Sequence, residues 1–145
     1  MDDLHPLYRY ISLRPDIKRA PALKLAYEIT KANLHGNYVR TCKLAEKLCP
    51  LTFCAFCLYL PTLQRDALRV IGLAYSSRAG SVPASVLRRW VGFSDEEATK
   101  AACDYYGLRV EKDQIHITKG AFKSDAELFK PKIDMRVNLR FEEVL

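Results

Sequence analysis

The chain has 145 residues, and its 23 Lys and Arg against 17 Asp and Glu give a formal charge of +6 with neutral histidines. Its composition of 49% apolar and 28% charged residues excludes a disordered or collagen-like chain and predicts one globular domain with a sizeable core. The longest apolar stretch, residues 51–60, is about half of the roughly 20 residues that span a bilayer, and the N-terminus is acidic where a signal peptide is basic. We therefore expect no membrane span and no secretion.

The cysteines favour a reduced compartment, because five is an odd number for a disulfide framework. Cys54 and Cys57 have the spacing of half a zinc site, but no second closely spaced Cys or His pair completes it, and the three histidines stand singly. Free cysteines are common core residues. We therefore predict no metal and no cofactor.

Helical periodicity dominates the first half of the chain. Apolar residues at i, i+3, i+4 and i+7 predict a helix from Pro21 to about residue 34. Gly36 ends this helix, and Asn37 is a suitable N-cap for a second helix over residues 38–49, so the two should form an antiparallel hairpin.

The next segment, residues 51–60, is apolar on every side, which predicts a helix enclosed by its neighbours. Pro61 should end that helix, and Thr62 should start a fourth one. We therefore expect a stack of helical hairpins over residues 1–80, resembling a solenoid in structure without a repeat in sequence.

A second pattern begins after a predicted flexible joint at residues 76–81. Val82-Pro83 is either a short edge strand or the start of a helix over residues 84–91, whose inward positions include Val86, Leu87 and Trp90. Ser94 and Glu97 have the spacing of a capping box, which predicts the start of another helix that ends at Gly107.

Two segments of alternating polarity follow, residues 108–111 and 114–117, and predict a β-hairpin turning at residues 112–113. Helix, turn, helix and hairpin is the order of a winged helix, which we place at residues 81–122. Residues 123–145 form a predicted C-terminal tail that is partly packed. The expected fold is thus mainly α: stacked helical hairpins followed by a winged helix with a small β-hairpin, in one continuous module.

No catalytic or nucleotide-binding motif occurs in the sequence, since GxxxxGK[ST], GxGxxG, GxSxG and HExxH are all absent. Asp95, Glu96 and Glu97 resemble a carboxylate cluster, but acids in the first turn of a helix also complement its dipole, and we favour this second interpretation. We therefore expect no enzyme and no small-molecule substrate.

Charge on the predicted winged helix is divided. Its second helix opens with three acids, which repel duplex phosphates and argue against reading of the major groove. Five basic residues lie on the preceding helix and near the hairpin: Arg88, Arg89, Arg109, Lys112 and Lys119. They fit either contact with nucleic acid or a solvated face, and the sequence leaves both interpretations open. The basic excess lies in residues 1–80, with 12 Lys and Arg against 6 Asp and Glu, and we attribute most of it to solubility.

A helical stack that leads directly into a winged helix is the architecture of PCI-type scaffold domains. Four segments, in this order and spacing, narrow the resemblance: residues 32–40 (ANLHGNYVR), 65–68 (RDAL), 93–98 (FSDEEA) and 103–110 (CDYYGLRV). Together they resemble the C-terminal half of the GANP / Sac-three family, and the resemblance covers roughly residues 20–125. The family's N-terminal helices have no counterpart here, so we expect a fragment or a short member.

The resemblance implies a non-enzymatic scaffold of nuclear mRNA export, located at the nuclear envelope or pore. Its implied partners are a second PCI-domain protein, a small acidic subunit and single-stranded RNA or DNA. The five basic residues given above would contact nucleic acid, and Trp90, Phe93 and Tyr106 would lie on the partner side. Two alternatives stay open: a short, centrosome- or spindle-associated member in the centrosome or cytoplasm, and a protein-only scaffold of another PCI assembly.

Overall fold

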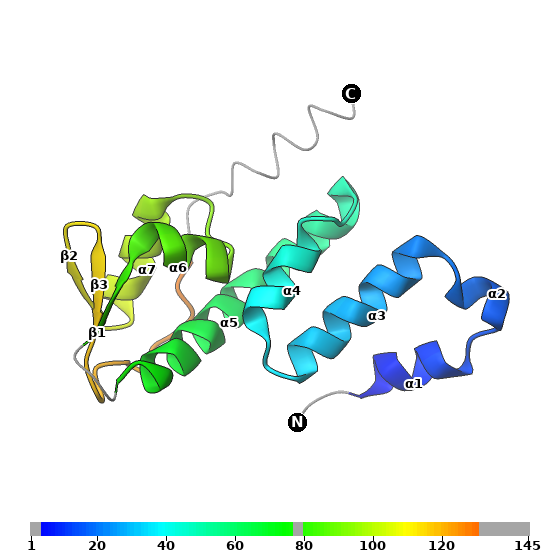
Figure 1. Ribbon diagram of the computed structural model, residues 1–145, viewed down its shortest axis with the longest axis horizontal. Coiled ribbons are helices and arrows are strands. Elements are labelled where there is room, and N and C mark those ends of the chain that lie inside the picture. Colours follow the sequence, from blue (N-terminus) through cyan, green and yellow to red (C-terminus); the bar gives the residue numbers. More distant parts are fainter. Residues whose placement is uncertain (1–3, 77–79, 131–145) are drawn as a thin grey trace.

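The computed structural model describes residues 4–76 and 80–130, and it has an elongated shape with the N-terminal helices at one end and a small sheet at the other (Figure 1). The mainly helical architecture is confirmed. The described helices are α1 (His5–Ser12), α2 (Pro15–Lys18), α3 (Pro21–Leu34), α4 (Tyr38–Ala45), α5 (Pro50–Ala74), α6 (Ala84–Val91) and α7 (Glu96–Tyr105). The described strands are β1 (Gly80–Pro83), β2 (Arg109–Glu111) and β3 (Gln114–Ile117).

The predicted hairpin of α3 and α4 is confirmed. Gly36 adopts φ +65° at the turn, and the Asn37 side chain caps α4 by accepting a hydrogen bond from the amide of Arg40 at 3.1 Å. Arg40 in turn pairs with Glu28 of α3 at 2.8 Å. The helix α4 ends at Ala45, earlier than predicted, because Pro50 forces the preceding residue, Cys49, into an extended conformation.

The prediction of a helix break at Pro61 is wrong, because α5 continues through this residue to Ala74. A proline inside a helix costs about 3 kcal/mol through its missing N–H and its ring. Leu60 and Leu63 flank the proline and are 6% and 0% exposed in a cluster with Cys42 of α4, so packing on both sides offsets this cost. The structure also contradicts the enclosed helix expected over residues 51–60, since Leu58 is 86% exposed.

The winged-helix topology is confirmed, with one strand more than the predicted hairpin. The sheet has the order β1-β3-β2 and is antiparallel throughout, and Ile115 of β3 lies opposite both Val82 and Val110. Val82-Pro83 is therefore an edge strand, and Pro83 ends it without removing a bond from a central strand.

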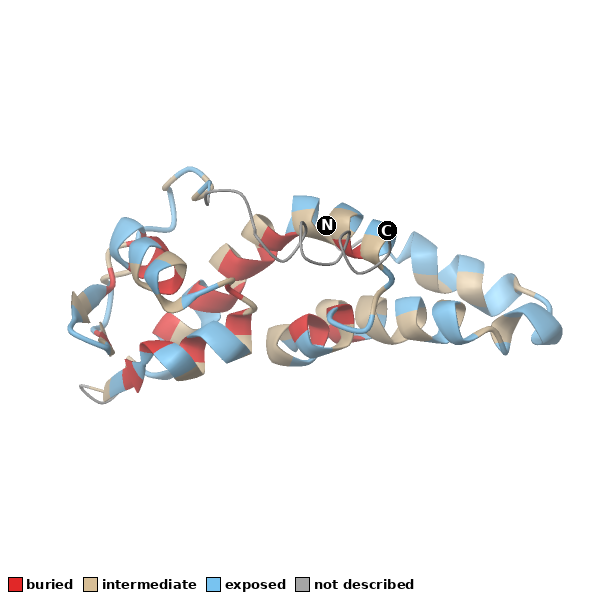
Figure 2. Cartoon of the chain, turned by 90° about the horizontal axis from the view of Figure 1, so that it is seen from above, coloured by how far each residue is buried: buried red, intermediate tan, exposed pale blue. Residues whose placement is uncertain are grey.

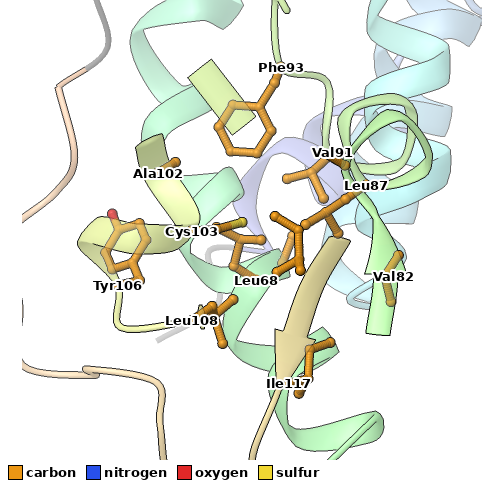
Figure 3. Close-up of a cluster of buried hydrophobic side chains, with 13 residues drawn as sticks. Leu68, Val82, Leu87, Val91, Phe93, Ala102, Cys103, Tyr106, Leu108 and Ile117 are labelled. Carbon is orange, nitrogen blue, oxygen red and sulfur yellow. The ribbon is translucent and has the colours of Figure 1, made fainter. Parts of the chain in front are cut away.

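The main hydrophobic core gathers residues from α5, α6, α7 and the sheet (Figure 3). Leu68 of α5, Leu87 of α6 and Ile115 of β3 are all 0% exposed in this cluster. The helix α5 thus serves as the first of the three helices of the winged helix, and the core continues across residue 80. Buried residues concentrate at this end and along α5, whereas α1 and α2 contain none (Figure 2).

The capping box predicted at Ser94 is shifted by one residue. Asp95 is the N-cap of α7, and its carboxylate accepts a hydrogen bond from the amide of Ala98 at 2.7 Å. A carboxylate adds charge to the positive end of the helix, which makes it a stronger acceptor there than the Ser94 hydroxyl. Glu97 does not reach back to the cap and instead pairs with Lys100 at 3.6 Å.

The last residue of the predicted winged helix, Phe122, and the first part of the predicted tail pack on Tyr106. The side chain of Phe122 stacks on the Tyr106 ring with 5.3 Å between centroids, and the amide of Phe129 donates to the Tyr106 hydroxyl at 2.9 Å. Residues 131–145 of this predicted tail, and residues 77–79 of the predicted joint, lie outside the described part of the chain.

A substitution at Gly107 should destabilise the winged helix more than the same substitution at Gly36. Both glycines have positive φ, but a Cβ at Gly107 would lie 2.5 Å from the carbonyl oxygen of Ala121, whereas a Cβ at Gly36 meets nothing within 4 Å. Gly36→Ala should therefore cost about 1 kcal/mol for the left-handed backbone alone, and Gly107→Ala roughly 3 kcal/mol. Urea unfolding of both variants measures the difference, and equal losses would contradict the close approach.

Candidate partner and nucleic-acid interface

The exposed face of α6 carries two adjacent cations. Arg88 and Arg89 are exposed, together with Ser85 one turn earlier. The Arg88 Nε donates to the carbonyl oxygen of Ser94 at 3.3 Å, and neither arginine forms an ion pair within the described residues. They lie in the last turn of α6, where the helix dipole favours positive charge. This face therefore presents two uncompensated positive charges to solvent.

The wing presents fewer unpaired basic side chains than its sequence suggests. Arg109 forms an ion pair with Glu111 inside β2, and Glu111 also faces His116 at 3.3 Å. Lys112, at the hairpin turn with φ +53°, and Lys119, after β3, are exposed and have no ion pair in the part of the chain that the structure describes. Of the three predicted wing cations, two are therefore available to an anion and one is already compensated.

The helix α7 presents acids to solvent. Asp95, Glu97 and Asp104 are exposed, and Lys100, its one cation, pairs with Asp113 of the hairpin turn at 2.8 Å. A hydrogen bond from Lys100 lowers the pKa of Asp113, and the same bond raises the pKa of Lys100. This arrangement fixes the wing against α7 and leaves the helix without a side chain that reads base edges in a major groove.

Trp90 lies in an apolar hollow between the helical stack and the winged helix. The hollow has a volume of about 330 Å³. It is lined by the α3–α4 turn, the first residues of α4, the C-terminal half of α5 and the last residues of α6. Trp90 stacks on Tyr75 with 6.4 Å between centroids, and Val70 and Leu73 of α5 are 43% and 71% exposed nearby along the helix. Helical periodicity assigns α5 one buried face, and the structure covers this face only in part near Trp90.

Phe93 and Tyr106 do not lie on a surface. They are 4% and 1% exposed, and both belong to the main core. Their placement on the partner side is therefore corrected. Phe93 follows the end of α6 and Tyr106 the end of α7, and both rings point into the core instead of facing solvent. Trp90 is the remaining aromatic candidate of the three.

The cysteines do not form a cluster that holds a metal. Cys42 and Cys103 are buried, and burial raises the pKa of Cys103 to about 12. Cys54 and Cys57 lie on α5, and Cys49 precedes it. Within residues 4–76 and 80–130, no group of three His, Cys, Asp or Glu side chains is placed to bind a metal ion.

The described residues thus combine a helical stack and a winged helix on one core, with an apolar hollow at Trp90 and a basic face on α6. Residues 1–112 match the sequence model of the SAC3/GANP family. The chain therefore belongs to this family. The family is one of non-catalytic scaffolds.

Among curated proteins, SAC3 family protein B from Arabidopsis thaliana is 22% identical over 149 residues. That similarity covers 95% of this chain but 9% of the relative, so the chain spans a small part of that protein's length. No solved structure matches the chain significantly. None of the described helices is both long and apolar enough to span a bilayer.

The pairing of Lys100 with Asp113 should be visible in the titration of Asp113. Its carboxyl should titrate below the ordinary value of 3.8, and Lys100→Ala should move the midpoint back up toward that value. Because the folded pKa is the lower one, the stability that this pair contributes is present above pH 3.8 and is lost as the pH falls through the folded pKa. Carbon-detected NMR of the carboxyl groups measures both midpoints, and an unchanged midpoint in Lys100→Ala would refute the pairing.

Proposed function

We propose that this chain is a non-enzymatic scaffold segment in nuclear mRNA export that binds a second PCI-domain protein and single-stranded nucleic acid. Its membership of the SAC3/GANP family supports the scaffold role. The observation that carries the proposal is the division of α6, which directs Arg88 and Arg89 to solvent and places Trp90 in the apolar hollow. One short helix thus offers a surface for an anionic strand and another for a protein.

Single-stranded nucleic acid fits the charges better than a duplex does. The acids of α7 oppose a duplex docked on that helix, whereas a flexible strand can follow Arg88, Arg89, Lys112 and Lys119 without contacting α7. With so few phosphate contacts, the affinity of the isolated chain should be weak and should fall steeply with salt.

The protein partner that fits the Trp90 hollow is the winged helix of another PCI subunit. Tryptophan is enriched among residues that dominate binding energy, Val70 lines the same hollow, and Tyr75 stacks on the Trp90 ring. A small acidic subunit is a further proposed partner, consistent with the formal charge of +6. A nuclear location and the absence of catalytic activity belong to the same proposal.

A protein-only scaffold is the second candidate function. Two observations favour it: Arg109 is compensated by Glu111, and the exposed face of α7 is acidic. In this alternative, which includes centrosomal or spindle assemblies, Arg88 and Arg89 are solvated and the Trp90 hollow alone binds.

Reversal of the charge on α6 distinguishes the nucleic-acid-binding scaffold from the protein-only scaffold. Arg88→Glu/Arg89→Glu should weaken binding of a single-stranded oligonucleotide by at least about 10-fold at low salt and should reduce the slope of log K against log salt by about 1.4, because two phosphate contacts are lost. Fluorescence anisotropy over a salt series measures both quantities.

The matched control is Lys24→Glu/Lys31→Glu, which makes the same change of charge on exposed positions of α3. This variant should lose much less affinity than the α6 variant. Equal losses would indicate attraction by net charge alone, and no binding by the unaltered chain even at low salt would favour the protein-only scaffold.

Truncation of Trp90 tests the protein surface. Trp90→Ala should abolish co-purification of a PCI-domain partner from cells, whereas Trp90→Phe should retain part of it because an aromatic ring still stacks on Tyr75. Quantitative mass spectrometry of tagged chains measures the recovery. Full recovery of the partner by Trp90→Ala, with both variants folded by circular dichroism, would move the interface elsewhere.

A further inference from the structure

The N-terminal half of α5 exposes an apolar surface that α3 reaches at its edge, where the Nδ2 of Asn33 donates a hydrogen bond to the Tyr59 hydroxyl at 3.5 Å. We call Leu51, Ala55, Leu58 and Tyr59 the α5 stripe. Leu51 is 74% exposed, Leu58 86% and Tyr59 43%, and Ala55 is also exposed. At 100° per residue these positions lie on one side of the helix, opposite the buried Phe53 and Leu60. The stripe is therefore a continuous face and not a set of isolated apolar residues.

The composition of this segment suits a buried helix. Between Lys47 and Arg65 the sequence contains no charged residue, and its Leu, Phe, Cys and Tyr side chains point in every direction. A helix that is apolar all round is normally buried. Here the packing of α4 and the winged helix covers one side only, so the other side has the properties of an interface.

Positive charge lies beyond both ends of the α5 stripe, and the stripe itself contains no charged residue. Lys47 is exposed four residues before Leu51, next to the N-terminus of α5, where the helix dipole adds positive potential. Arg69 is exposed ten residues after Tyr59 and, by helical periodicity, lies on the same side as Leu51 and Leu58. Arg65 and Asp66 lie between Tyr59 and Arg69 and pair with each other at 2.9 Å, so they add no net charge. Neither Lys47 nor Arg69 has an ion pair in the described part of the chain.

We propose that the α5 stripe binds an amphipathic helix of another protein whose apolar face is flanked at both ends by acidic residues. An apolar face with residues at i, i+3, i+4 and i+7 matches Leu51, Ala55 and Leu58, and Ala55 leaves room for a close approach. The distance along α5 from Leu51 to Arg69 is about 27 Å, which is the length of a helix of about 18 residues. Acids in its first and last turns would lie opposite the two positive ends.

Charge decides between this occupant and a second copy of the chain. Two copies packed through their stripes would bring together two chains of formal charge +6, with Lys47 and Arg69 of each copy near the cations of the other when the helices are antiparallel. That arrangement is repulsive, whereas an acid-flanked helix compensates both ends. The proposal does not depend on nucleic-acid binding or on the Trp90 hollow, which uses other residues of α5.

A pair of synthetic peptides tests the proposal directly. Both have 18 residues with leucine at i, i+3, i+4 and i+7. One carries Glu in its first and last turns, and the other carries Lys at the same positions. The full chain should bind the Glu peptide at least about 10-fold more tightly than the Lys peptide, measured by fluorescence anisotropy. In NMR spectra, the amide shifts that the Glu peptide changes should centre on residues 51–59.

Two variants locate the contact. Leu58→Lys places a charge in the middle of the stripe and should weaken binding of the Glu peptide by at least about 30-fold. Lys47→Glu/Arg69→Glu should reverse the preference, so that the Lys peptide binds more tightly. Lys24→Glu/Lys31→Glu makes an equal change of charge on exposed positions of α3 and should leave the preference unchanged.

Four results would overturn the proposal: no saturable binding of the Glu peptide, equal or tighter binding of the Lys peptide to the unaltered chain, shifts centred outside α5, or a dimer in sedimentation velocity that Leu58→Lys dissociates. The last result would assign the stripe to a second copy. None of these results bears on the α6 surface, so the outcome is independent of the proposed role in mRNA export.

Discussion

The contact on which the rest of the structure depends is the burial of the C-terminal half of α5 in the core of the winged helix. Leu63 and Leu68 are 0% exposed, and Leu68 belongs to the cluster that also holds residues of α6, α7 and the sheet. Burial of one leucine side chain stabilises a fold by about 1.5–3 kcal/mol. Because α5 also packs on α4, the stack and the winged helix cannot rotate against each other without exposing this core.

This constraint gives α6 two separate surfaces. Leu87 and Val91 are 0% exposed on its inner side, so the remaining positions of an eight-residue helix divide between the solvent side and the side toward α5. Arg88 and Arg89 occupy the first, and Trp90 occupies the second. The packing of α6 on α5 therefore places the basic face and the apolar hollow on neighbouring sides of one helix.

Local rules predicted the elements whose ends depend on one or two residues. Gly36 and Asn37 defined the α3–α4 turn, and alternating polarity defined the hairpin of β2 and β3. The course of the chain through Pro61 was not predictable in the same way, because the cost of that proline is offset by Leu60 and Leu63, which pack against residues distant in sequence. The burial of Phe93 and Tyr106, which the family resemblance placed on the partner side, likewise depends on contacts that only the folded chain brings together.

The charges of the candidate site show why composition alone is insufficient. Residues 81–145 hold 11 basic and 11 acidic residues, which suggests a neutral half with little attraction for an anion. In the described part of the chain, four of these acids belong to α7 and its N-cap, and Glu111 compensates Arg109 inside β2, whereas Arg88 and Arg89 have no acid paired to them among the described residues. A net charge of zero over this half is thus compatible with a basic surface beside an acidic one. The local potential depends on the distance between opposite charges and not on their number alone.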